Sequence, residues 1–222
     1  MTVRDYIQNK KVKHFSISGV EVFEKDPLSN NLDAKKIITF ILNGLPSHLL
    51  SNVDSIYIGS FDFLKDRQVQ AAYENSSVFV TNEQDDEEDM IDDIIHEIAH
   101  SVEEKYTSEI YADDKIENEF IQKRKNLWLI LKDQGYDAEL QDFLNVRYSS
   151  NFDDYLYKEV GYPELAMVTA NSFYSPYAVT SLREYFANGF EAFFMSDDID
   201  RLKKISPQLF MKIAMLLNMA EI

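Results

Sequence analysis

The residues whose types and spacing offer the clearest chemistry are His96, Glu97 and His100, which spell H-E-x-x-H within Asp92–His100. Two imidazoles four residues apart project from the same side of a helix, close enough to hold one metal ion. The glutamate beside the first histidine can then reach a metal-bound water and act as its base. A chance match in a chain of this length is expected roughly once in a hundred, so the motif favours a zinc site over an ordinary amphipathic helix.

The apolar residues around the motif predict the helix that must carry it. At 100° per residue they gather into one stripe, formed by Ile91, Ile94, Ile95, Ile98 and Val102. His96 and His100 fall on the side away from this stripe, where a cleft can expose them. The acidic run Asp85–Asp93 predicts the start of the helix, because carboxylates in a first turn are favoured by the helix dipole. Calcium binding by this run is the alternative, but the glycine-containing loop of an EF-hand is missing.

A third ligand is expected downstream of the motif. The chain has no cysteine, which excludes disulfides and thiolate ligands, and a catalytic zinc usually has three protein ligands and one open position. Glu184 is the best candidate, on a helix predicted from Thr180 or Ser181 to about Met195. The residues from Ser181 to Glu184 also match a capping box, in which Glu184 would reach back to the backbone of Ser181. Spacing alone leaves both interpretations open.

Two blocks of the sequence together resemble a known enzyme family. The combination of H-E-I-A-H with a later Y-x6-E-Y-F-A-x-x-F is similar to the anthrax lethal factor and Pro-Pro endopeptidase group of zinc metallopeptidases, over roughly 90–106 and 174–212. The resemblance implies a zincin-like fold and Zn²⁺ bound by His96, His100 and Glu184. It also implies that Glu97 is the catalytic base and that Tyr177 donates a hydrogen bond to the transition state.

The sequence departs from the family pattern in two places. Asn188 stands where the family usually has a second glutamate, so the orientation of the ligand by its neighbours is expected to differ. The stretch between the two blocks is also long, and the region 110–160 is interpreted as a helical insertion that covers the cleft or contacts a partner. Glu103 is a weak candidate for orienting an imidazole, and a solvated carboxylate is the alternative. Tyr174 is a weaker substitute for Tyr177.

The rest of the chain predicts the elements that position these residues. Alternation and turn residues predict strands within His14–Glu24, Val53–Ser60 and Gln70–Thr81, and a helix capped by Asp33. From Lys115 onward the pattern is helical. The expected class is α+β, helix-rich, with a small N-terminal sheet and a helical C-terminal lobe. We expect a single metallopeptidase domain over 1–222, with an N-lobe at about 1–106, the insertion at about 110–160 and a C-lobe at about 161–222. An extended substrate would pair with the strand near Ser77–Val80.

The composition of the chain limits which classes of partner the protein is expected to bind. The net charge of −17 over 222 residues opposes binding to nucleic acid. It suits a peptide or protein substrate with basic residues, although a solvated acidic surface explains it equally well. No apolar run reaches the roughly 18–20 residues of a membrane span, and no signal peptide is visible. The expected locations are therefore the cytoplasm, a host cell after delivery or a virion, unless a leader has been removed.

These observations predict a zinc-dependent endopeptidase that hydrolyses peptide bonds through a metal-activated water. The alternative is a non-catalytic structural or interaction protein, such as a phage or toxin component, that keeps a lethal-factor-like fold. The intact motif together with Tyr177 and Glu184 favours the enzyme, because a retired site has no physical need for all five residues. Neither the substrate sequence nor the oligomeric state follows from the sequence.

Overall fold

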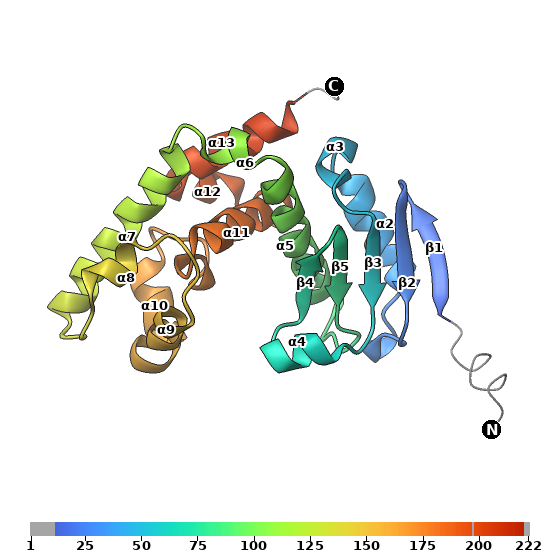
Figure 1. Ribbon diagram of the computed structural model, residues 1–222, viewed down its shortest axis with the longest axis horizontal. Coiled ribbons are helices and arrows are strands. Elements are labelled where there is room, and N and C mark those ends of the chain that lie inside the picture. The colour runs from blue at the N-terminus through green and yellow to red at the C-terminus, as the bar shows by residue number, and fades with distance from the viewer. Residues whose placement is uncertain (1–11, 197, 220–222) are drawn as a thin grey trace. The chain divides into compact units, whose positions relative to one another are not determined.

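The computed structural model describes residues 12–196 and 198–219, and the chain divides into two compact units between Lys105 and Tyr106 (Figure 1). The first unit contains a five-stranded mixed sheet and several helices, whereas the described part of the second is helical. The predicted α+β class is therefore confirmed. The single metallopeptidase domain over 1–222, with its lobes and insertion, stays a prediction. None of the helices in the described ranges is long and apolar enough to cross a membrane.

The sheet is built from two antiparallel hairpins joined through parallel pairs. Its strand order is β1-β2-β3-β5-β4, and the strands are β1 (Lys13–Ile17), β2 (Val20–Glu24), β3 (Ser55–Ile58), β4 (Ala71–Glu74) and β5 (Ser77–Val80). Both hairpins turn through two residues with positive φ, Ser18-Gly19 and Asn75-Ser76. This backbone matches the twist of the flanking strands. Each turn lies within a range where strands were predicted, His14–Glu24 and Gln70–Thr81.

The order of the strands corrects one prediction. The strand β5 lies inside the sheet, paired in parallel with β3 and antiparallel with β4. It has no open edge, so the prediction that Ser77–Val80 accepts the substrate is wrong. The strand at this edge is β4. A hairpin pattern in a sequence does not say which of its two strands faces the rest of the sheet, because that depends on the distant partner β3.

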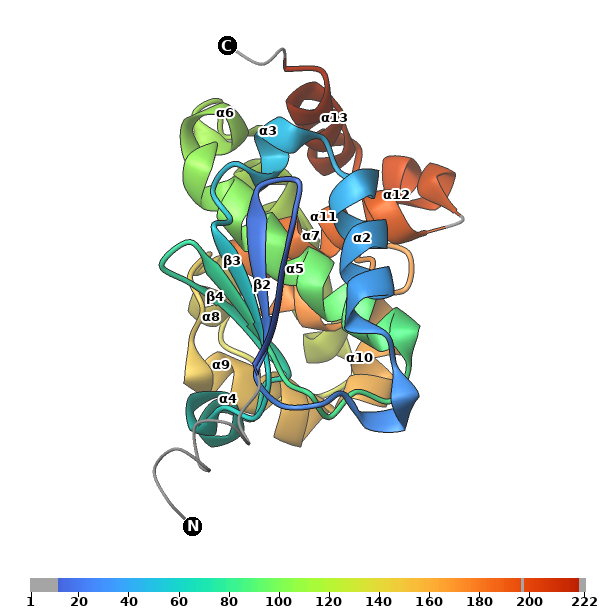
Figure 2. The same ribbon diagram turned by 90° about the vertical axis from the view of Figure 1, so that its right-hand side faces the viewer.

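Helices cover one face of the sheet (Figure 2). The helix α2 (Ala34–Gly44) contacts β1, and α5 (Glu87–Lys105) contacts β4 and β5. The shorter helices of this unit are η1 (Ser29–Asn31), α3 (Ser47–Leu50) and α4 (Asp62–Arg67). The fully buried core includes Val22, Ile56, Val78, Ile94 and Ile98, each 0% exposed. The alternation of the strands and the stripe of α5 therefore meet in one apolar layer, as the hydrophobic pattern predicts.

Side chains cap the two long helices of this unit. Asp33 accepts a hydrogen bond from the backbone N–H of Lys36 at 3.1 Å and so begins α2 as predicted. At the start of α5, Asp86 accepts from the backbone N–H groups of Glu88 at 2.8 Å and Asp89 at 3.0 Å. These bonds satisfy donors that a helix leaves unpaired at its N-terminus. The acidic run therefore starts the helix, as predicted.

The second unit consists of helices and helical turns. They are α6 (Thr107–Tyr111), α7 (Lys115–Asp133), α8 (Leu140–Leu144), α9 (Ser150–Asp154), the π-helical turn η2 (Tyr155–Val160), α10 (Tyr162–Thr169), the 3₁₀ turn η3 (Tyr177–Val179), α11 (Leu182–Met195), α12 (Ile199–Ile205) and α13 (Pro207–Leu217). The helix α11 contacts η3, α7, α12 and α13. Gly189 allows the approach to α13, because a Cβ atom there would overlap the side chain of Leu209. The segment that carries Glu184 is thus packed from several directions.

Candidate metal centre

The histidine half of the candidate site lies on α5. The ring centroids of His96 and His100 are 5.0 Å apart, with ring planes at 86°. His96 is half-buried and His100 is 6% exposed. The helix is fixed from behind by the buried stripe of Ile94, Ile98 and Val102. The spacing of four residues therefore places both imidazoles on one side of the helix, as the motif predicts.

Glu97 is held by the sheet. Its carboxylate Oε2 accepts a hydrogen bond from the backbone N–H of Tyr73 at 2.6 Å, and the residue is only 9% exposed. Tyr73 belongs to the edge strand β4. A buried carboxylate needs such a donor, and the bond fixes one carboxylate oxygen. Sequence reasoning missed this contact, because a backbone donor leaves no mark on the residue pattern.

Glu103 lies against His100. Its Oε2 atom is 3.6 Å from Nδ1 of His100, and its side chain is 14% exposed. The side chain is thus partly shielded from solvent, and both interpretations of Glu103 stay predictions. The residue sits where a carboxylate can orient an imidazole, one helical turn further along α5.

Asp93 is an acidic neighbour of the motif that the sequence did not single out. Burial raises the pKa of its carboxyl from 3.8 to about 6, a hydrogen bond from Gln84 at 3.0 Å opposes this shift, and the negative charge of Glu97 adds to it. Its position, one turn before Glu97 on the same helix, could have identified Asp93 as a neighbour of the motif. It was overlooked because it belongs to the acidic run, which was interpreted only as the start of the helix.

The glutamate half of the candidate site lies on the first turn of α11. Ser181 is the N-cap, because its hydroxyl accepts from the backbone N–H of Glu184 at 3.1 Å. This contact is the first half of the capping box. Asn188, 6% exposed, donates from Nδ2 to the carbonyl oxygen of Glu184 at 3.0 Å, and its Oδ1 accepts from the hydroxyl of Ser175. Where the family pattern has a second carboxylate, this chain has an amide that steadies the backbone of Glu184.

Tyr177 precedes the same turn, on η3. It is 37% exposed, and burial raises the pKa of its phenol above the usual range, with a further contribution from the charge of Glu184. The phenol therefore keeps its proton at neutral pH and remains a hydrogen-bond donor. Tyr174, the weaker candidate, already donates its hydroxyl to Ser196 Oγ at 2.6 Å.

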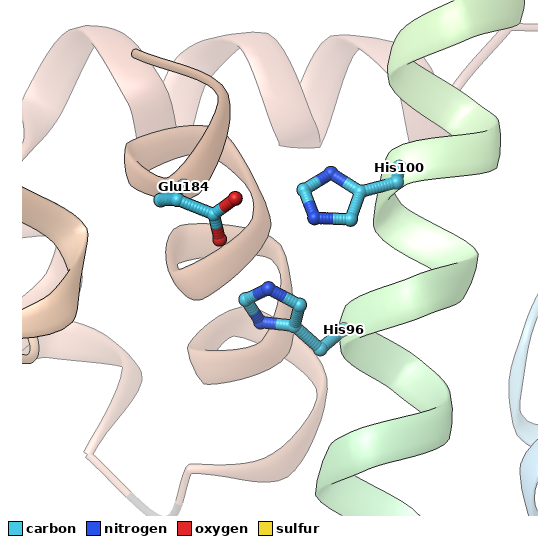
Figure 3. A group of neighbouring side chains, drawn as sticks. All are labelled: His96, His100 and Glu184. Carbon is cyan, nitrogen blue, oxygen red and sulfur yellow. The ribbon is translucent and has the colours of Figure 1, made fainter. Parts of the chain in front are cut away.

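Three predicted ligands come together. One ligand atom from each of His96, His100 and Glu184 lies within 4.8 Å of the others, and Figure 3 shows both imidazoles and the carboxylate turned toward one another. Zinc takes its ligands at about 2.0–2.2 Å, so three atoms this close together could hold one ion after a small movement of the side chains. Two neutral nitrogens and one carboxylate oxygen also form a donor set that zinc accepts. Within the described ranges these residues form the group of His, Asp and Glu side chains arranged to hold a metal ion.

In comparisons with known proteins, no family model matches the chain, and neither a curated protein nor a solved structure matches it. The likeness to lethal-factor-type peptidases therefore rests on the two motif blocks. The chain is an α+β protein in which His96, His100 and Glu184 could hold a metal ion.

Proposed function

We propose that this protein is a zinc-dependent endopeptidase in which His96, His100 and Glu184 bind the ion. One observation carries the proposal: the two imidazoles of H-E-x-x-H lie within 4.8 Å of a carboxylate that is 84 residues further along the chain than His100. If His96 and His100 only formed the solvated face of an ordinary helix, nothing would require a carboxylate from a distant helix to lie beside them. The two histidines and one glutamate also leave room for a fourth, exchangeable position.

The side chains around the ligands support hydrolysis. A bound zinc supplies electrophilic activation of water and of a carbonyl group. Glu97 takes the proton of the attacking water and returns it to the leaving amine, acting as a general base and then as a general acid. The hydrogen bond from Tyr73 to its Oε2 holds the carboxylate for this transfer. Tyr177, which keeps its proton, donates a hydrogen bond to the oxyanion.

Two features favour a peptide as the substrate. The strand β4 lies at the edge of the sheet, and an extended peptide can add through main-chain hydrogen bonds to the side of such a strand that faces no other strand. Acidic and aromatic groups also surround Tyr177. Asp153, which accepts from the hydroxyl of Tyr148 at 2.9 Å, contributes negative charge at Tyr177. With a net charge of −17, these groups favour basic residues in the substrate.

The test combines metal analysis with peptide cleavage. Wild-type protein is expected to bind one equivalent of zinc and to cleave members of a peptide library. Glu97→Gln should keep the zinc and lose cleavage, whereas Glu184→Gln should lose zinc. Glu88→Gln, an exposed position on the same helix, is the matched control and should behave like the wild type. Absence of zinc from the wild type would refute the proposal.

The same experiment separates the second candidate. A non-catalytic structural or interaction protein would keep zinc in the wild type and show no cleavage that depends on Glu97. The replacement of a carboxylate by Asn188 near the ligand is the observation that favours this candidate.

A further inference from the structure

A buried polar network lies beside the ligand-bearing turn of α11. Lys123 on α7 donates from Nζ to the hydroxyl of Tyr185 at 2.5 Å and to Oγ of Ser206 at 2.7 Å. The three residues are 9%, 1% and 0% exposed, respectively. Burying a lysine is costly unless its donors are paired. The network therefore places a charge in the interior of the unit, with defined partners.

Glu119, one turn before Lys123 on α7, completes the network. Its Oε1 accepts from the hydroxyl of Tyr185 at 2.8 Å. The same carboxylate accepts from the backbone N–H groups of Gln208 at 2.9 Å and Leu209 at 3.2 Å. These two groups belong to the first turn of α13, which has no partners of its own for them. One carboxylate thus caps α13 and holds a tyrosine of α11.

The neighbour of Lys123 on α7 reaches the same turn by a second route. Arg124 is 0% exposed and donates to the carbonyl oxygens of Asn145, at 2.8 Å, and Asp142. These carbonyls lie at the end of α8. The next residue, Val146, accepts from the backbone N–H of Leu182 at 2.9 Å, which is the first residue of α11. Two adjacent buried cations of α7 are therefore each linked to the first turn of α11, Lys123 through Tyr185 and Arg124 through the end of α8.

Tyr185 connects this network to the candidate ligand, because it directly follows Glu184. Successive side chains on a helix point about 100° apart, so the tyrosine enters the core while the glutamate points to the two imidazoles. Fixing the hydroxyl of Tyr185 sets the rotation and register of the first turn. Metal ligands must be held to within about half an ångström of their working geometry.

We propose that Lys123 and Glu119 are positioning residues that hold Glu184 for metal binding through Tyr185. This gives α7 a structural task inside the unit, in the region expected to cover a cleft or contact a partner. A general contribution to stability does not account for the arrangement, since buried charged groups are often no more stabilising than apolar residues of similar volume. The role at the metal rests on the proposed function, whereas the role in fixing the first turn of α11 does not.

The test compares two network variants with one core variant of the same unit. Lys123→Met removes the cation and keeps the length of the side chain. Tyr185→Phe removes only the hydroxyl, and is the milder change if Lys123→Met fails to fold. Leu131→Ala truncates a fully buried residue on α7 that takes no part in the network described above. Two properties are measured for each protein: hydrogen exchange at the amides of 182–185 relative to those of α5, without metal, and zinc affinity by competition with a chelator.

The network variants are expected to exchange these amides faster and to bind zinc about 10–100-fold more weakly, the usual loss when an orienting partner of a metal ligand is removed. Leu131→Ala should change zinc affinity by less than about threefold. Unchanged exchange at 182–185 in both network variants would overturn the inference. So would zinc affinity equal to that of the wild type. If the wild type binds no zinc, the proposed function fails, and the exchange comparison still decides whether the network fixes the turn.

Discussion

The two halves of the candidate site are built in different ways. The histidine half needs one helix: the spacing of His96 and His100 places both rings on one side, and the apolar stripe of α5 packs the other side. The glutamate half needs several elements. Glu184 depends on the cap by Ser181, the amide of Asn188 and the network that holds Tyr185.

This difference predicts which substitutions disturb each half of the candidate site. Local geometry set by a helix survives most changes elsewhere, because the relation between residues i and i+4 is intrinsic to the helix. A ligand held by contacts from other elements moves when any of those elements shifts. We therefore expect substitutions around α5 to change chemistry or titration, and substitutions of the residues that hold Glu184 to weaken zinc binding. Five predictions test this comparison, from the largest expected effect to the smallest.

The strongest test on the histidine half is Glu97→Gln compared with Glu97→Ala. Loss of the base is expected to lower kcat by about 10²–10⁴-fold in both variants. Glutamine keeps an acceptor for the N–H of Tyr73, whereas alanine leaves that donor unpaired at a cost of about 1–3 kcal/mol. Peptide cleavage and thermal unfolding measure the two effects. Equal stability of the two variants would show that the bond to Tyr73 does not hold Glu97.

Tyr177→Phe tests the glutamate half without touching a ligand. Removal of one donor to the oxyanion is expected to lower kcat by about 10²–10³-fold. Zinc affinity should stay at the wild-type value, and KM should change little. Kinetics of peptide cleavage at saturating substrate, together with a zinc titration, separate these quantities. A loss of zinc from this variant would assign Tyr177 to ligand positioning.

Asp93→Asn gives a pH-dependent difference on the histidine side. The pKa of Asp93 is raised in the folded protein from 3.8 to about 6, so the folded state prefers the protonated acid. Its favourable contribution is complete below pH 3.8 and is lost as the pH rises through about 6. The metal-free asparagine variant should therefore be more stable than the wild type above pH 7, by up to about 3 kcal/mol. The difference should vanish near pH 3.5, as measured by denaturant unfolding at both pH values.

Gly189→Ala tests the packing of α11 on α13. The added methyl group would overlap Leu209, and overpacking of this kind costs about 1–3 kcal/mol. Chemical denaturation should show the loss. Leu209→Ala in the same background makes room for the methyl group and should recover part of the loss relative to Leu209→Ala alone. Additive effects of the two substitutions would contradict the proposed overlap.

Ser181→Ala is the smallest change. Loss of the N-cap is expected to cost about 1 kcal/mol of stability, while Ser181→Gly should cost only a few tenths. Unfolding curves of the three proteins measure this order. Because the cap binds the N–H of Glu184, the alanine variant should also bind zinc more weakly than the wild type. The matched cap of the other half, Asp86→Ala, should leave zinc affinity unchanged.

Much of the local structure was predictable. The hairpin turns, the cap by Asp33 and the start of α5 all depend on residues within a few positions of one another. Predictions failed where long-range packing decides the outcome. The pattern from Lys115 onward predicted helices but not where they break or which faces are buried: α8 spans only Leu140–Leu144, and Leu129 on α7 is 57% exposed. Periodicity alone does not say which face of a helix meets a neighbour.

The candidate site follows the same division. The spacing of H-E-x-x-H determined by itself that two imidazoles share one side of a helix, because helical geometry is local. Only the tertiary structure decided that Glu184 turns its carboxylate toward them while its N–H is held by Ser181. Only the fold placed the N–H of Tyr73 on Glu97 and a lysine of α7 on Tyr185. Those contacts join residues far apart in the chain, and some of their partners are backbone groups that every residue carries. The pattern of side chains in the sequence therefore does not predict them.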